Sequence, residues 1–249
     1  MRAFLSLYPS LLCLLMSASA GDIYPGGSSP VSSRASDRAS QAAQRVTPIL
    51  NRELASIGCQ VGAPLFIRVF KETSELEVWL QPDASSSFVH FRTYRIAAHS
   101  GKLGPKTKQG DFQAPEGFYF VTQRGLNPHS SYHLSFNLGY PNAYDRAHGR
   151  TGDFLMVHGK NVSIGCYAMT DDSIEQIYTL ASAALRQGQN YFRVHCFPFR
   201  FGKERMTAAE TSPWFAFWKN LEEGYDAFEQ TRVPPNIIVR NKRYVIDSH

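Results

Sequence analysis

The sequence predicts a β-rich α+β domain, in which short strands form a sandwich or barrel and a few helices lie at its periphery. Two observations lead to this prediction. First, much of the chain after residue 64 consists of short apolar segments rich in Val, Ile, Phe and Tyr, separated by Gly, Pro, Asn and Ser, which is typical of strands and turns. Second, only a few segments combine helically spaced apolar residues with capping residues. Patterning alone leaves the strand order open.

The length of 249 residues fits one large domain with extensions. Residues 1–20 are typical of a secretory signal peptide, because Arg2 is followed by the apolar run around Leu11–Met16 and by the cleavage site Ala18-Ser19-Ala20. The run is too short to span a membrane and no stop-transfer segment follows it. We therefore expect a periplasmic protein that is exported by a cleaved signal peptide and does not span the membrane.

The charge of the chain gives little information about partners. Arg2 is the only charged residue removed with the signal peptide, so the formal net charge falls from +5 to +4. A mild positive charge suits an anionic polymer but is also ordinary for a domain of this size. No basic run interleaved with aromatic residues is present, so we expect no nucleic acid partner.

The segment after the signal peptide is predicted to be a leader and a helix. Residues 21–46 are rich in Ser, Gly, Pro and Ala, which is typical of a flexible leader. A helix over residues 47–63 is expected to follow, because Thr47 can cap it, Pro48 suits its first turn and Gly58 can end it.

The strands are expected from residue 65 onward. Leu65–Lys71 and Leu76–Gln81 flank the polar residues 72–75 and are predicted to form a hairpin. The Gly101–Phe112 segment is predicted to be a loop, since glycines and prolines interrupt it. The other strand-like segments are Phe88–Ala97, Gly117–Thr122, Tyr132–Leu138, Phe154–Val157 and Tyr191–Phe197.

Two helices are expected in the second half of the chain. Asp172 can cap the first, with Glu175 as its capping-box partner, and Gly188 can end it. Trp214–Leu221 is predicted to be the second.

The chain is expected to close with a hairpin. Its strands are Ile237–Arg240 and Arg243–Ile246, and Asn241-Lys242 forms the turn. Residues 197–218 are rich in aromatic residues and could form a lid or part of the core, and we expect core.

The segment Phe154–Met169, FLMVHGKNVSIGCYAM, carries the chemistry. Cys166 follows His158 by eight residues, and Gly159 and Gly165 lie beside them. A thiolate can attack a carbonyl carbon, and a nearby imidazole can take up the thiol proton. Gly165 leaves room for the substrate and for backbone N–H groups to turn toward an oxyanion. On the alternative interpretation, Cys166 is a small buried apolar residue and His158 is a hydrogen-bonded structural residue.

The pattern HG…SxGCxxM resembles the signature of the YkuD-type L,D-transpeptidases, and Tyr167-Ala168-Met169 after the cysteine is most similar to the YafK-type branch. The resemblance implies a YkuD-like β-sandwich or barrel, with a catalytic domain at residues 64–200 and a C-terminal extension, residues 201–249, packed on it. Other stretches that carry the resemblance are Lys102–Lys106, Gln109–Phe112, Pro115–Tyr119, Pro141–Gly149, Gly224–Asp226 and Pro234–Pro235.

The resemblance implies a cysteine enzyme that acts on the stem peptides of peptidoglycan, usually at a carbonyl of diaminopimelate. Cys166 is then the nucleophile, His158 the general acid and base, and Gly165 part of the oxyanion region. A backbone carbonyl or a carboxylate should orient His158, with Asp145 and Asp153 as candidates. No cofactor is expected, and the histidines lack metal-binding spacing. The expected substrate-binding residues are Arg146, Tyr144, His148, Ser163 and Tyr167.

Two features leave alternatives open. His148 lies eighteen residues before Cys166 and is a rival base, although His158 follows an apolar strand directly, as the first histidine of the family does. Most of the family has Ser-His-Gly-Cys at the nucleophile, and Ile164 replaces that second histidine here.

Three functions compete. The first is a hydrolase that cuts the amide between diaminopimelate and an outer-membrane-anchored protein, as the YafK-type resemblance implies. The second is a transpeptidase that forms peptidoglycan crosslinks or attaches lipoproteins. The third is a non-enzymatic periplasmic wall-binding protein. The missing second histidine and the likeness to the YafK-type branch favour hydrolysis.

The cysteine count leaves the pairing open. Cys13 lies in the signal peptide, so Cys59, Cys166 and Cys196 remain. A Cys59–Cys196 disulfide with Cys166 free is one arrangement, and two unpaired buried cysteines are the other. For either enzyme function, we expect a depressed pKa of the Cys166 thiol.

Overall fold

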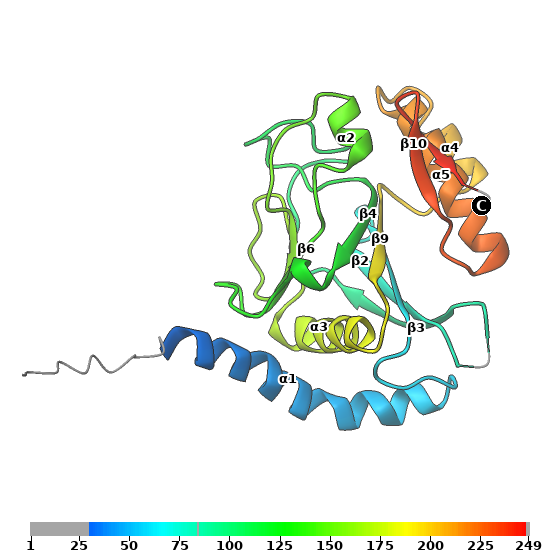
Figure 1. The fold of residues 1–249 in the computed structure, drawn as a ribbon. Coiled ribbons are helices and arrows are strands. Elements are labelled where there is room, and N and C mark those ends of the chain that lie inside the picture. Colours follow the sequence, from blue (N-terminus) through cyan, green and yellow to red (C-terminus); the bar gives the residue numbers. More distant parts are fainter. Residues whose placement is uncertain (1–29, 84, 248–249) are drawn as a thin grey trace, which may run out of the picture.

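A computed structural model describes residues 30–83 and 85–247 (Figure 1). The expected signal peptide and the first part of the expected leader lie outside these residues. The sequence-based fold class is confirmed, because mixed sheets with a few helices form an α+β structure. The sheets are open at their edges, so the sandwich form is correct and the barrel form is not.

The first helix, α1, spans Pro30–Ala55 and corrects the expectation that a helix begins at Thr47. Pro48 lies inside this helix, where it removes one backbone hydrogen bond. Burial of Ala42 and Val46 on one face before the proline, and of Leu50 and Leu54 after it, offsets this loss. The helix ends at Ala55, and Gly58 leads the chain away in the left-handed conformation (φ +67°).

The larger sheet has five strands in the order β3-β2-β1-β9-β4, and only β1 and β9 run parallel. The predicted hairpin of β1 and β2 is confirmed. In β1, Leu65, Ile67 and Val69 belong to the main core, whereas Phe66 and Phe70 face a second layer. Both faces are therefore covered. The strands are β1 (Leu65–Phe70), β2 (Glu75–Leu80), β3 (Val89–Arg95), β4 (Gly117–Thr122) and β9 (Tyr191–Phe197).

The smaller sheet has four short strands in the order β5-β6-β7-β8 and carries the segment of interest. A bridge between Ala98 and Ala168 connects β8 to the chain that leaves β3. The main core lies between the two sheets and includes Val121, Phe136 and Val157. The elements of this part are η1 (Gln123–Gly125), β5 (Leu126–Asn127), β6 (Ser135–Asn137), α2 (Ala143–Ala147), β7 (Met156–His158) and β8 (Tyr167–Ala168).

Helix α3 (Asp171–Arg186) closes the bottom of the core, and α1 packs beneath it (Figure 1). Its cap is Thr170, whose hydroxyl accepts the Ser173 N–H, and not Asp172 as expected. Glu175 instead binds Arg45 of α1 and His133. The expected capping box of Asp172 and Glu175 is therefore wrong.

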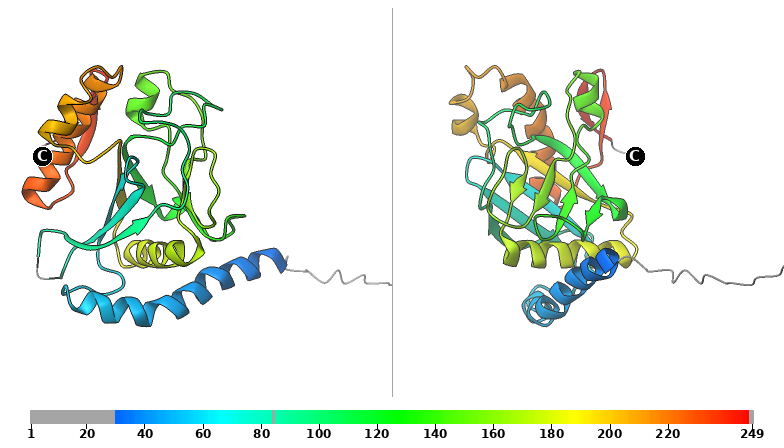
Figure 2. Two further views of the ribbon diagram at one scale, coloured as in Figure 1. Left: turned by 180° about the vertical axis from the view of Figure 1, so that it is seen from behind. Right: turned by 90° about the vertical axis from the view of Figure 1, so that its left-hand side faces the viewer.

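The C-terminal residues form a separate layer over the outer face of the larger sheet, seen edge-on in Figure 2. Phe199 and Trp218 are buried there, which confirms that the aromatic-rich segment is core. Phe228 of α5 contacts Phe66 and Trp79 of the sheet. The elements are α4 (Lys203–Thr207), α5 (Phe215–Thr231), β10 (Ile237–Arg240) and β11 (Arg243–Ile246).

The remaining expectations concern the hairpin, the disulfide and the membrane. Asn241 and Lys242 both have positive φ in the turn between β10 and β11, as expected.

Among the described residues Cys59, Cys166 and Cys196 are all free, so the two-unpaired-cysteine alternative is correct. No helix within residues 30–247 is long and apolar enough to cross a membrane.

Candidate active site

The pairing of β7 and β8 brings Cys166 next to His158. The two strands run parallel, with Val157 opposite Tyr167 and His158 opposite Ala168. Cys166 therefore lies across from Met156, whose backbone N–H donates to the Cys166 Sγ at 3.4 Å. Alternate residues of a strand share a face, so the thiol sits diagonally from the imidazole. Parallel strands usually need a crossover of a dozen or more residues, and residues 159–166 make this one unusually tight.

His158 is oriented by its own backbone neighbour. Its side chain is buried, and its Nδ1 lies 2.6 Å from the Gly159 carbonyl oxygen. A carbonyl only accepts, so Nδ1 carries the proton and Nε2 of the neutral ring is free to accept another. Burial lowers the pKa of His158, and the bond to Gly159 opposes this shift. The imidazole is therefore neutral near pH 7, as a general base must be.

Cys166 is half-buried, and its thiol is not activated in the free protein. Burial raises the pKa of the thiol, while the Met156 N–H and the charge of Lys106 oppose this shift. This corrects the expected depressed pKa. Within the described residues no hydrogen bond joins the thiol to His158, so the resting pair is a neutral thiol beside a neutral imidazole. Such hydrogen bonds often tighten only when substrate binds.

The turn before Cys166 is held by Ser163. Its hydroxyl donates to the Cys166 carbonyl at 2.7 Å and accepts the Gly165 N–H at 3.3 Å. Gly165 has φ +129°, which other residues rarely adopt. Its N–H is occupied by Ser163, so Gly165 contributes to this turn through its backbone conformation rather than through its own N–H. The Cys166 N–H makes no hydrogen bond within the described part of the chain and remains available.

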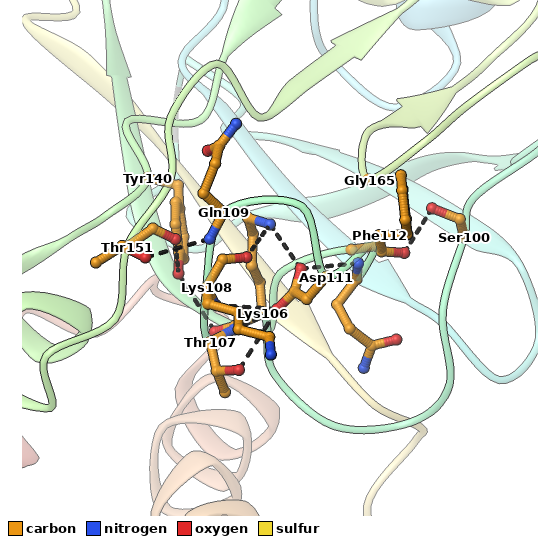
Figure 3. Close-up of polar contacts among 12 residues, drawn as sticks. Ser100, Lys106, Thr107, Lys108, Gln109, Asp111, Phe112, Tyr140, Thr151 and Gly165 are labelled. Carbon is orange, nitrogen blue, oxygen red and sulfur yellow. Dashed lines mark hydrogen bonds and ion pairs between the residues drawn. The ribbon is translucent and has the colours of Figure 1, made fainter.

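The loop of residues 101–112 lies against this turn (Figure 3). The Lys106 Nζ is buried and donates to Asp111 at 2.6 Å and to the Lys108 carbonyl at 2.9 Å. Burial raises the pKa of Asp111, but bonds from Lys106 and from the N–H groups of Thr107, Lys108 and Gln113 outweigh it and lower the value to about 2. The ion pair fixes a positive charge close to the thiol. The Gln113 carbonyl oxygen, from the residue after Phe112, lies 3.6 Å from the position that a Cβ atom on Gly165 would occupy.

The residues around α2 form a structural cluster. Asp145 is fully buried, forms a capping box with Asn142 and an ion pair with Arg150, and does not orient His158. His148 is exposed and stacks on Tyr144, with ring centroids 4.1 Å apart. Arg146 is exposed and donates to the Pro141 carbonyl. Among the described residues no hydrogen bond or ion pair joins this cluster to Cys166 or His158.

Two further expected residues lie away from the thiol's surface. The Tyr167 side chain is fully buried, and its hydroxyl donates to the Pro115 carbonyl at 2.6 Å. It cannot contact substrate through that side chain. Asp153 is exposed and makes no hydrogen bond or ion pair within the described residues. Its role as an orienting group for His158 is taken by the Gly159 carbonyl.

Sequence reasoning missed Lys106 and Tyr132. The Tyr132 ring lies 4.7 Å from that of His158, and Lys160 lies over the Tyr132 ring. Neither residue stands at a recognisable spacing from Cys166, and both reach the site through loops. The three lysines of the 101–112 loop were the only signal that could have indicated a charge there.

A thiol, a neutral imidazole fixed by a backbone carbonyl and a free N–H at the nucleophile define a candidate cysteine acyl-transfer site. A family model described as the YkuD L,D-transpeptidase catalytic domain matches residues 71–190. The chain is 45% identical over 186 residues to the Escherichia coli strain K12 protein provisionally named L,D-transpeptidase YafK, covering 75% of each chain. The O157:H7 protein of the same name matches equally. The chain therefore belongs to the YkuD family of L,D-transpeptidases, which act on peptidoglycan.

Solved structures give weaker similarities. The helical cell shape determining protein Pgp2 of Campylobacter jejuni, as its K307A mutant, matches with TM-score 0.45 and 19% identity over 70% of this chain and 61% of that chain. Bd1075 of Bdellovibrio bacteriovorus matches with TM-score 0.39 and 18% identity over 75% of this chain and 83% of that chain.

Proposed function

We propose that this protein is a periplasmic cysteine hydrolase that cuts the amide between diaminopimelate of a peptidoglycan stem peptide and an attached protein. The observation that carries this proposal is the placement of Cys166 across from Met156, diagonal to the neutral His158. Family membership supports the substrate class, and the expected signal peptide supports the periplasmic location.

The reaction begins with the thiol. His158 Nε2 takes the thiol proton as Cys166 Sγ attacks the amide carbonyl, because both groups rest in their neutral forms. The Cys166 N–H stabilises the oxyanion, and the fixed charge of Lys106 favours the anionic states of the site. His158 then returns the proton to the leaving amine. This leaves a thioester between Cys166 and the diaminopimelate carbonyl.

The second step decides between two activities. Water attacks the thioester in a hydrolase, with His158 again as the base, and releases a stem peptide with a free carboxylate. An amine attacks it in a transpeptidase. The sequence VHGKNVSIGCYAMT and the substitution of the second histidine by Ile164 favour hydrolysis. The description of the family model favours transpeptidation, which is the second candidate function.

A non-enzymatic wall-binding protein is the third candidate function, and it requires a buried Cys166 with an unperturbed thiol and no imidazole in reach. Cys166 is only half-buried and His158 lies on the adjoining strand, which argues against it.

The test is incubation of the mature protein with murein sacculi that carry bound lipoprotein, followed by mass analysis. Release of protein ending in unmodified lysine, by the wild type and not by Cys166→Ala, supports the hydrolase. New crosslinked stem dimers, or loss of terminal D-alanine, would support the transpeptidase instead. If neither change depends on Cys166, both enzymatic functions are excluded.

A further inference from the structure

Exposed apolar side chains gather around the nucleophile. Ten large apolar side chains are exposed among the described residues, and five of them lie on the nucleophile segment Phe154–Met169 or on the loops that contain Phe112 and Tyr132. These five, which we name the apolar rim, are Phe112, Tyr132, Phe154, Val162 and Ile164. Scattered exposed apolar residues need no explanation, but a group around one site marks an interaction surface.

The contacts place the rim next to the reacting groups. The Phe154 carbonyl oxygen lies 3.7 Å from the Cys166 Sγ. The Tyr132 ring covers His158. Ile164, the most exposed of the five at 78%, stands two residues before the nucleophile. Phe112 precedes Gln113, whose carbonyl oxygen lies 3.6 Å from the position that a Cβ atom on Gly165 would occupy. The rim thus borders the thiol from three different segments of the chain.

Two members of the rim are also held in an unfavourable backbone conformation. Phe112 has φ +54° and Phe154 has φ +52°, in the left-handed region that bulky residues rarely occupy. Their side chains are 58% and 66% exposed, so burial does not offset this cost. Such conformations cluster at ligand-binding and active sites, where the surrounding structure holds them. A ligand that covers both rings accounts for them better than packing does.

We propose that the apolar rim binds the protein segment adjoining the scissile amide, through the aliphatic or aromatic side chains of that segment. This inference rests on the proposed function and names what recognises its substrate. Stem peptides and glycan strands offer carboxylates, amides and hydroxyls, and little apolar surface. A protein chain that continues from the amide can supply apolar side chains. Aromatic anchors beside a partly buried site are typical of binding hot spots.

The test measures binding separately from catalysis. In a Cys166→Ala background, calorimetry compares a muropeptide that carries the protein segment with the same muropeptide without it. The double change Phe112→Asn and Phe154→Asn removes both rings and introduces asparagine, which tolerates left-handed φ. We expect this change to raise the Kd of the protein-linked ligand on the order of tenfold, which is the effect of losing about 1.4 kcal/mol. The Kd of the protein-free muropeptide stays within twofold.

The matched control is Phe120→Asn. Phe120 is 59% exposed, close to the 58% of Phe112, but lies on β4 beside Tyr191 and outside the rim. Its replacement leaves both Kd values unchanged. Equal weakening of both ligands by the double change, or no weakening of either, overturns the proposal. The proposal is also overturned if the Cys166→Ala protein, without the double change, binds the two ligands equally well.

A lipid surface is the other macromolecule that could use such a rim. Sedimentation with vesicles of phosphatidylethanolamine and phosphatidylglycerol tests this, and vesicle binding that the double change abolishes would assign the rim to lipid and overturn the proposal. Failure of the proposed function has a different signature. The sacculi remain uncut by the wild type, whereas the binding comparison still gives its own answer.

Discussion

The loop of residues 101–116 contacts two regions of the molecule that differ in how completely their polar groups are hydrogen-bonded. At its base, Lys71 donates to the carbonyls of Gly104 and Ala114 and to Glu116, and Glu116 accepts from Gly104 and Trp218. Both charged side chains are fully buried and fully satisfied. This region is a rigid anchor.

The nucleophile segment, Phe154–Met169, lies against the far part of the same loop. Its hydrogen-bonding groups are not all paired. Its thiol has one weak donor in Met156, and the Cys166 N–H is free within the described residues. Phe154, Val162 and Ile164 of the segment are exposed. Completed hydrogen bonding stabilises a fold, whereas incomplete hydrogen bonding leaves groups available to a substrate. The comparison therefore separates residues that hold the site from residues that react.

The largest expected effect is loss of the reacting thiol. Cys166→Ala should lower turnover by about 10⁴-fold or more, because no covalent intermediate can form. Cys196→Ala is the matched control, since Cys196 is fully buried in the larger sheet. It should cost about 1 kcal/mol of stability and leave turnover largely intact. Turnover is measured by release of protein from sacculi, and stability by urea unfolding. Equal losses of turnover would contradict the assignment.

The next largest effect concerns the base. His158→Asn should lower kcat/KM by about 10²- to 10⁴-fold. In the wild type, the fall of activity on the acid side should occur below the usual imidazole value of about 6.5, because burial lowers the pKa of His158 and the ring stays neutral to lower pH. A pH profile of kcat/KM measures this. If His148→Asn costs as much as His158→Asn, the rival base is correct.

Loss of the Lys71–Glu116 ion pair in the anchor should lower the free energy of unfolding more than it lowers turnover. Glu116→Gln leaves the buried ammonium of Lys71 without its counter-charge, and we expect a loss of about 3–5 kcal/mol in the free energy of unfolding. Adding Lys71→Met should recover part of this loss. Thermal and urea unfolding measure both variants. A Glu116→Gln protein as stable as the wild type would mean that the anchor does not depend on the ion pair.

The smallest expected effect is electrostatic. Alkylation of Cys166 by iodoacetamide should keep rising with pH beyond the usual thiol range, because burial raises the pKa of the thiol. Lys106→Met removes a charge that opposes this shift and should move the alkylation profile to still higher pH. Lys102→Met, on an exposed lysine of the same loop, is the control. A profile that is flat from neutral to mildly acid pH would show a depressed thiol pKa instead.

Local sequence signals predicted the local elements well. The turns at residues 72–75 and at Asn241-Lys242 carry their own backbone preferences, so the hairpins of β1 with β2 and of β10 with β11 were found with nearly correct ends. The start of α1 was wrong, because Pro48 in a favourable first-turn position outweighed a weak apolar pattern before it. Tertiary contacts stabilise that earlier part of the helix, namely packing against α3 and the hydrogen bonds from Arg38 to the Ser130 and His133 carbonyls.

The residues of the candidate site also divide into those that local sequence signals indicated and those that only the fold brings together. Cys166 and His158 were found because they lie on one short segment with glycines beside them. Lys106 and Tyr132 were not, since loop closure over long sequence separations brings them to the thiol. The residues around α2 shared a motif with the family, yet they hold one another and make no hydrogen bond or ion pair to the thiol or imidazole within the described residues.

A neutral resting thiol also protects the protein from oxidants. Peroxides attack the thiolate, and susceptibility follows thiolate character and exposure. Cys166 is half-buried with a raised pKa, and the other described cysteines are buried and free, so none is in a state that oxidants attack quickly. In the proposed mechanism, the thiolate forms only while His158 takes the proton during attack on substrate. Reactivity toward an amide and resistance to oxidants are thereby separated in time.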